Sequence, residues 1–116
     1  MRVTCSLDPT LRSTCATVAG HMDPDGAARV RDELVAHIGP QTPSLLLDLR
    51  AVEWMSSAGV GTLMHLFARV QAHAGRMALW GCVPRVRAIL RVCGLESPLN
   101  VCETEDEARQ RLVPPQ

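Results

Sequence analysis

The sequence predicts an α/β fold, a sandwich in which helices flank a mixed sheet that includes parallel strands. Strand-like runs alternate with amphipathic helical patterns, and turn and cap residues separate them at regular intervals. One run, Leu45-Leu46-Leu47-Asp48-Leu49, is nearly continuously apolar. Such a run is typical of a central strand that is covered on both faces. The predicted order is β-β-α-β-α-β-α-β-α.

Two strands are predicted before the first helix. From Arg2 to Leu7 apolar and polar side chains alternate, with the apolar ones at odd-numbered positions, which is the period of a half-buried strand. Ser13 to Ala19 is a second β-prone run after a turn around Asp8-Pro9. The two runs could form a hairpin.

The first helix is expected to begin with Asp23 as its N-cap and Pro24 at its first position. Gly39-Pro40 is expected to end it. Residues three or four apart predict its buried face, which consists of Ala27, Val30, Leu34 and Ile38.

A longer helix is predicted after residues 55–59, and Gly75 is expected to close it. Its spacing predicts a buried stripe made of Val60, Leu63, Met64, Phe67, Val70 and Ala74. The same spacing turns four side chains toward water, namely Thr62, His65, Arg69 and His73.

The remaining elements are a strand at Met77 to Cys82, a helix that Pro84 opens and that Gly94 follows as the C′ residue, a short strand at Leu99 to Cys102 and a last helix. A capping box of Thr104 to Glu107 opens that last helix. The inward residues predicted for the helix from Pro84 are Val86, Ile89, Leu90 and Cys93.

Length and composition favour one domain over residues 1–112, with a loose tail at 113–116. Twelve basic residues balance twelve acidic ones, so no net field concentrates a polyanion, and direct nucleic-acid binding is not expected. The longest uncharged stretch, Trp54 to Ala68, is too short for a spanning helix, so no membrane insertion is expected. Met1 to Ser6 lacks the apolar core of a signal peptide, which makes a cytoplasmic location the default.

The five cysteines are odd in number and form no Cys-x-x-Cys pair, which argues against a disulfide framework and a zinc ribbon. We interpret them as small buried apolar residues, and we expect no metal and no cofactor. An enzyme that uses His21, His65 or a cysteine would need a matched base or carboxylate. No such constellation is readable, so no catalytic residue is predicted.

The segment from Asp48 to Gly61 joins the central strand to the longer helix. In open α/β sheets such loops tend to carry the ligand or partner site. Ser56 and Ser57 stand where the helix begins, so either can cap it. An anion attached there would face free backbone N–H groups and the positive end of the helix dipole.

Gly59 and Gly61 each cost about 1 kcal/mol relative to Ala inside a helix. Either tight packing of the helix on the sheet explains them, or the close approach of another protein or of a nucleotide phosphate. The chain has no Lys, so it has no P-loop, and the Gly-x-Ser-x-Gly pattern of a nucleophile elbow is absent as well.

These residues resemble the STAS domain of bacterial anti-sigma factor antagonists over nearly the whole chain. Gly20-His21-Met22-Asp23 is similar to the family's Gly-x-apolar-Asp, and residues 56–61 are similar to its Asp-Ser-[Ser/Thr/Ala]-Gly-Leu-Gly. The resemblance also covers Leu46-Leu47-Asp48-Leu49, Gly75, Gly81, Pro84, Val86, Leu90, Gly94-Leu95, Glu105 and Ala108. It implies a STAS-like mixed sheet flanked by helices.

In the family, the Ser after the Asp accepts a phosphate. Aligned on the two glycines, this acceptor is Ser57, and Ser56 stands in the place of the Asp. The resemblance implies that the unmodified chain binds an anti-sigma factor, a histidine-kinase-like ATPase that acts as a Ser kinase, and so releases a sigma factor. Phosphorylation would end that binding, and a phosphatase would restore it. The implied partner-binding residues are Asp23, Ser56, Ser57, Ala58, Gly59, Val60, Gly61, Thr62, His65 and Arg69.

A second interpretation is a STAS subunit of a transporter or signalling assembly that is not phosphorylated. In that case Ser57 only caps the helix. The Ser in the place of the family's Asp favours this interpretation.

Overall fold

The structure, a computed structural model, describes residues 1–114, so Pro115 and Gln116 of the predicted tail lie outside the described residues. The predicted order of elements is confirmed. The elements are β1 (Arg2–Asp8), β2 (Ser13–Met22), α1 (Pro24–Val35), β3 (Ser44–Met55), α2 (Ser57–Ala72), β4 (Met77–Trp80), α3 (Pro84–Val92), β5 (Val101–Cys102) and α4 (Glu105–Leu112).

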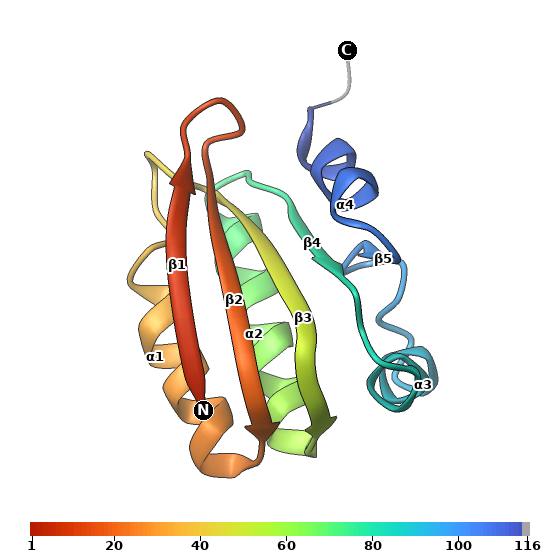
Figure 1. Ribbon diagram of the computed structural model, residues 1–116. Coiled ribbons are helices and arrows are strands. Elements are labelled where there is room, and N and C mark those ends of the chain that lie inside the picture. The colour runs from red at the N-terminus through yellow and green to blue at the C-terminus, as the bar shows by residue number, and fades with distance from the viewer. Residues whose placement is uncertain (115–116) are drawn as a thin grey trace.

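One five-stranded sheet, in the order β1-β2-β3-β4-β5, organises the chain (Figure 1). β1 and β2 form the predicted antiparallel hairpin, and the other neighbouring strands are parallel. The predicted central strand, β3, lies between β2 and β4. It is longer than predicted because it continues beside β2 through two register shifts as far as the pair Met22 and Met55.

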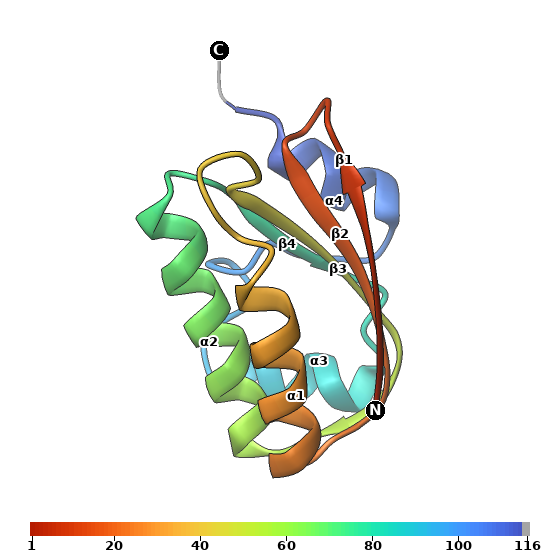
Figure 2. The same cartoon turned by 90° about the vertical axis from the view of Figure 1, so that its left-hand side faces the viewer.

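Helices cover the two faces of the sheet unequally (Figure 2). Buried residues of α1, α2 and α3 join the inner side of the sheet in one large core. On the other face α4 packs over β4 and β5 around a smaller core that contains Leu46, Trp80 and Ala108. Figure 1 looks onto this side of the sheet, and no helix of the described chain lies in front of β1 and β2 there.

The predicted buried face of α1 is confirmed, since Ala27, Val30, Leu34 and Ile38 are all buried. Asp23 caps the helix as expected, with its carboxylate accepting from the amide of Gly26 at 2.7 Å. The helix ends at Val35, before the predicted Gly39-Pro40, and Ile38 reaches the core from the segment that follows.

The predicted faces of α2 are partly wrong. Thr62 is buried, and its hydroxyl donates to the carbonyl oxygen of Ala27 at 3.0 Å, whereas Met64 is 52% exposed. Leu66, outside the predicted stripe, is fully buried, and Ala74 is exposed beyond the end of the helix. The reason is that α2 packs against α1 as well as against the sheet. The buried face of this helix is therefore wider than predicted and includes Thr62 and Leu66.

The prediction that the cysteines are buried is also largely wrong. Cys5 is exposed with its neighbour Leu7 because β1 is an edge strand that little covers, and Cys93 is exposed because it follows the last turn of α3. Cys15 and Cys82 are half-buried, and Cys102 is buried. Burial raises the pKa of the Cys82 thiol to about 11, so this group is held in its protonated form at neutral pH.

An ion pair strengthens the middle of the central strand. Asp48 is a buried residue, and its carboxylate accepts from the guanidinium of Arg50 at 2.9 Å and from the backbone amide of Arg50 at 3.0 Å. The same guanidinium lies over the ring of Trp80, 4.3 Å from its centroid. Burial alone would raise the pKa of Asp48, but the hydrogen bonds from Arg50 outweigh it and hold this pKa below its usual value.

The lowered pKa of Asp48 predicts a pH dependence of stability. A carboxyl whose pKa is lower in the folded state stabilises the fold above its unfolded pKa of about 3.9, and this contribution is lost as the pH falls through the folded value. Chemical denaturation of the protein and of Asp48→Asn should therefore show the largest difference in stability above about pH 5, and a smaller one toward pH 2. A difference that stays constant over this range would contradict the assignment.

Candidate functional site

The start of α2 is tied to the sheet by Ser56. Its hydroxyl accepts from the amide of Gly59 at 3.3 Å and donates to the carbonyl oxygen of Met22 at 2.9 Å, and its own amide also donates to that carbonyl at 2.9 Å. Ser56 is therefore the N-cap, and it joins the ends of β2 and β3 to the first turn of α2.

Ser57 is the first residue of α2, and it is exposed. Within residues 1–114 no hydrogen bond fixes the orientation of its hydroxyl. No acidic residue lies in the first turn of the helix. An anion on this hydroxyl would thus meet the positive end of the helix dipole and no neighbouring carboxylate from that turn.

The two glycines of the motif have different roles. A Cβ atom on Gly59 would lie 2.5 Å from Cγ of Met55 and 3.2 Å from the carbonyl oxygen of Met22, so packing of α2 on the sheet explains this residue. Gly61 is exposed, and nothing lies within 4 Å of the place of its Cβ. Packing within the described chain therefore does not explain Gly61.

The structure exposes only part of the predicted partner-binding set. Asp23, Ser57, Gly61, His65 and Arg69 are exposed, Ser56 and Ala58 are half-buried, and Gly59, Val60 and Thr62 are buried. The guanidinium of Arg69 donates to the carbonyl oxygen of Ile38 at 3.3 Å, so this side chain is tied to the segment that follows α1.

Sequence reasoning missed Met64 as a surface residue. Ser57, Gly61 and Met64 follow one another at spacings of four and three, so they share one side of α2. His65 and Arg69 adjoin that side. The spacing from Ser57 was the available signal, but Met64 is apolar and its position also suits a buried stripe.

A second exposed group lies at the ends of β2 and β3. His21 and Glu53 approach to 3.4 Å, and both side chains are mostly exposed. Trp54 pairs with His21 in the sheet and is 38% exposed. Because Ser56 follows two residues later, this group flanks the start of α2.

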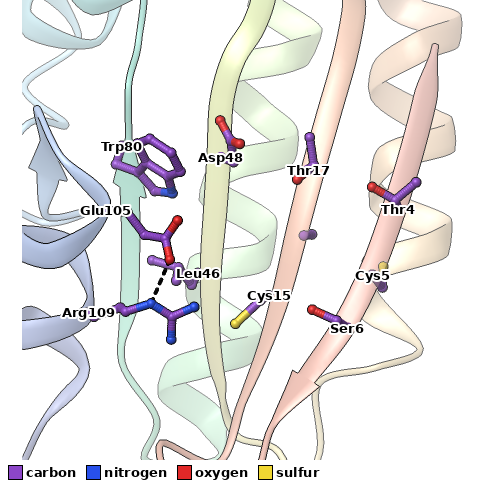
Figure 3. A pocket seen from close by; sticks show the side chains of 11 residues that line it. Thr4, Cys5, Ser6, Cys15, Thr17, Leu46, Asp48, Trp80, Glu105 and Arg109 are labelled. Carbon is purple, nitrogen blue, oxygen red and sulfur yellow. Dashed lines mark hydrogen bonds and ion pairs between the residues drawn. The ribbon is translucent and has the colours of Figure 1, made fainter.

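A shallow cavity of about 270 Å³ lies on the other face of the sheet, in front of β1, β2 and β3 (Figure 3). Arg109 crosses it and binds Glu105 and Asp8, both at 2.7 Å. The other carboxylate of the lining, Asp48, pairs with Arg50, which lies outside the cavity. No cluster of three or more potential metal ligands occurs among the described residues. In the same part of the chain, no helix is long and apolar enough to cross a membrane.

The family model described as "Mlab, STAS domain" matches residues 5–102, so the chain belongs to the STAS domain family. The anti-sigma-B factor antagonist of Listeria monocytogenes is 26% identical over 90 residues, which cover 78% of this chain and 79% of that protein. The anti-sigma factor antagonist SpoIIAA in its unphosphorylated form has a TM-score of 0.75 at 24% identity, with 93% of this chain and 95% of that chain covered. Phosphorylated Bacillus SpoIIAA has a TM-score of 0.73 at 22% identity, with 97% of this chain and 100% of that chain covered. The predicted STAS-like fold is confirmed.

The contrast between the two glycines predicts opposite effects on stability. Gly59→Ala should destabilise the protein by about 1 to 2 kcal/mol, because overpacking outweighs the gain in helix propensity. Gly61→Ala, the matched control on the same helix, should stabilise it by up to about 1 kcal/mol. Chemical denaturation measures both. Equal effects of the two substitutions would show that packing does not distinguish these residues.

Proposed function

We propose that this chain is an anti-sigma factor antagonist that binds an anti-sigma factor and is released when Ser57 is phosphorylated. The observation that carries the proposal is the exposed Ser57 hydroxyl at the start of α2, beside a serine that already caps the helix. The relation to the Listeria monocytogenes anti-sigma-B factor antagonist supports it.

The division between the two serines makes Ser57 the better acceptor. Phosphorylation of Ser56 would disrupt the hydrogen bonds of its hydroxyl to Met22 and Gly59. Ser57 loses no such contact in the described chain. Phosphate on Ser57 therefore leaves the junction of β2, β3 and α2 intact.

Two electrostatic effects of the phosphate act in opposite directions. It adds about −1.5 to −2 charge at neutral pH. Within the domain, the helix N-terminus stabilises this charge by roughly 0.3 to 1 kcal/mol. Across a closely packed interface the charge must lose its water, and a coupling of about 1 to 3 kcal/mol weakens binding roughly 5- to 150-fold. The interface effect is the larger one, so the phosphate controls binding without unfolding the domain.

The two SpoIIAA structures support the inference that a phosphate leaves the fold intact. The unphosphorylated and phosphorylated forms match this chain with similar TM-scores, 0.75 and 0.73. In that protein, a phosphate is thus compatible with the fold.

The proposed docking surface is the exposed side of α2. Ser57 lies at its start, Gly61 lets a partner approach the helix backbone, and the 52% exposed Met64 supplies an apolar contact. His65 and Arg69 flank it, and half-buried Ser56 and Ala58 border it. Asp23, the cap of α1, lies next to Met22, whose carbonyl holds Ser56.

The proposed partner is an anti-sigma factor with a histidine-kinase-like ATPase fold. In the transfer step the bond between the γ-phosphorus of ATP and the oxygen that bridges it to the β-phosphorus breaks, and ADP leaves. A new bond forms between this phosphorus and Ser57 Oγ, and the hydroxyl proton passes to a base of the kinase. Catalysis thus belongs to the partner, and this chain is a binding protein that acts in the cytoplasm. A phosphatase would reset it.

Phosphate transfer is tested by intact mass. Incubation with ATP and the candidate kinase should add one phosphate to the protein and to Ser56→Ala, and none to Ser57→Ala. Ser56→Ala is the control that separates capping from acceptance, because it should lower the unfolding free energy by about 0.5 to 2 kcal/mol while still accepting phosphate. A kinase that binds the chain but adds no phosphate would support the non-phosphorylated STAS subunit instead.

The effect on binding is tested with two variants. Ser57→Ala should remain bound to the anti-sigma factor, whereas Ser57→Glu should bind more weakly, by about fivefold or more. Both variants should stay folded, and the helix N-terminus should stabilise Ser57→Glu relative to Ser57→Ala by up to about 1 kcal/mol, because the side chain is exposed there. Equal affinities in isothermal titration calorimetry, with both variants folded, would contradict the switch.

A further inference from the structure

The outer edge of β1 carries no protection against pairing with another strand. β1 ends the sheet, and within residues 1–114 no strand lies beyond it. Natural edge strands are usually blocked by proline, by an inward charge, by a bulge or by short length. β1 has seven residues, Arg2–Asp8, no proline, and charged side chains only at its two ends. Its register with β2 is regular throughout.

The sequence of this strand is chemically symmetric about its central residue, Cys5. A hydroxyl residue lies on each side of it, then an apolar residue, and then an end residue that is basic at one end and acidic at the other. The order is Arg2, Val3, Thr4, Cys5, Ser6, Leu7 and Asp8.

We propose that two copies of this chain pair through β1, antiparallel and centred on Cys5, to form a ten-stranded sheet across a two-fold axis. Backbone groups of alternate residues point to opposite edges of a strand, so an antiparallel pair must match residues of like parity. Centring on Cys5 satisfies this condition and pairs all seven residues. It is an isologous contact, in which both copies use the same surface.

The symmetric register matches each residue with a suitable one in the second copy. Arg2 lies opposite Asp8, whose carboxylate is already held by Arg109 at 2.7 Å and by the amide of Leu11 at 3.2 Å. Val3, which packs on the core, lies opposite Leu7, which is 59% exposed in the single chain. The pairing thus covers the largest apolar group that β1 leaves in water, and it does so twice.

The proposed dimer leaves the Ser57 site accessible. Figure 2 looks onto the side of the molecule that would form the contact, and it shows β1 and α1 there. The two β1 strands run in opposite directions, so the two α2 N-termini lie toward opposite ends of the joined sheet. The dimer is therefore independent of the function proposed for Ser57, and its test involves no kinase.

The first test measures mass in solution. Light scattering after size-exclusion chromatography should show a mass that rises from 12.6 kDa toward twice that value as the protein concentration increases. Leu7→Asp should lower the mass measured at each concentration toward that of the monomer. Val92→Asp, a change at an 87% exposed apolar residue on α3, should leave these masses unchanged. Arg2→Glu should raise the dimer dissociation constant about tenfold, because it places like charges opposite each other in two symmetric pairs.

The second test locates the axis. Cys5 and Cys93 are the exposed thiols of the described chain. A short bis-maleimide, to which each thiol adds across one double bond, should link two copies of Cys93→Ser through Cys5. Cys5→Ser, which keeps Cys93, is the matched control and should give little product. A mass that stays at 12.6 kDa, or equal cross-linking of the two variants, would overturn the proposal.

Discussion

Hydrogen bonds of the Ser56 hydroxyl and amide hold together the parts of the fold that matter for its proposed function. They join the carbonyl of Met22 at the end of β2 to the last residue before α2 and to the amide of Gly59 in its first turn. Gly59 completes this arrangement, because the absence of a side chain lets the helix lie against Met55 and Met22. The position and direction of α2 follow from these contacts, and so does the exposure of Ser57.

This arrangement gives physical meaning to the Ser that replaces the family's Asp. A carboxylate at this position would also cap the helix, but it would bring a negative charge next to the proposed phosphate. The Ser56 hydroxyl provides the cap without that charge. Under the proposed phosphorylation of Ser57, a serine at position 56 would therefore keep the geometry and reduce the repulsion inside the domain.

The sequence predicts local features well and three-dimensional neighbours poorly. The order of elements, the hairpin and the caps at Asp23 and Thr104 follow from short-range patterns, and the structure confirms them. Which serine caps α2 depends on the carbonyl of Met22, 34 residues earlier, and no spacing within the motif shows this contact. Thr62 was misplaced for the same reason, since its partner is a carbonyl on α1.

The proposed switch and the proposed dimer use separate surfaces, the exposed side of α2 and the outer edge of β1. β2 lies between β1 and β3, so at the usual spacing of neighbouring strands about 10 Å separates β1 from β3, and α2 lies behind the sheet. At physiological ionic strength an exposed charge is screened over about 8 Å. A phosphate on Ser57 therefore acts strongly on a partner docked on α2 and weakly on the Arg2 and Asp8 pair of the β1 edge. Two copies joined through β1 would each respond to phosphorylation separately, so the state of one site would not determine the state of the other.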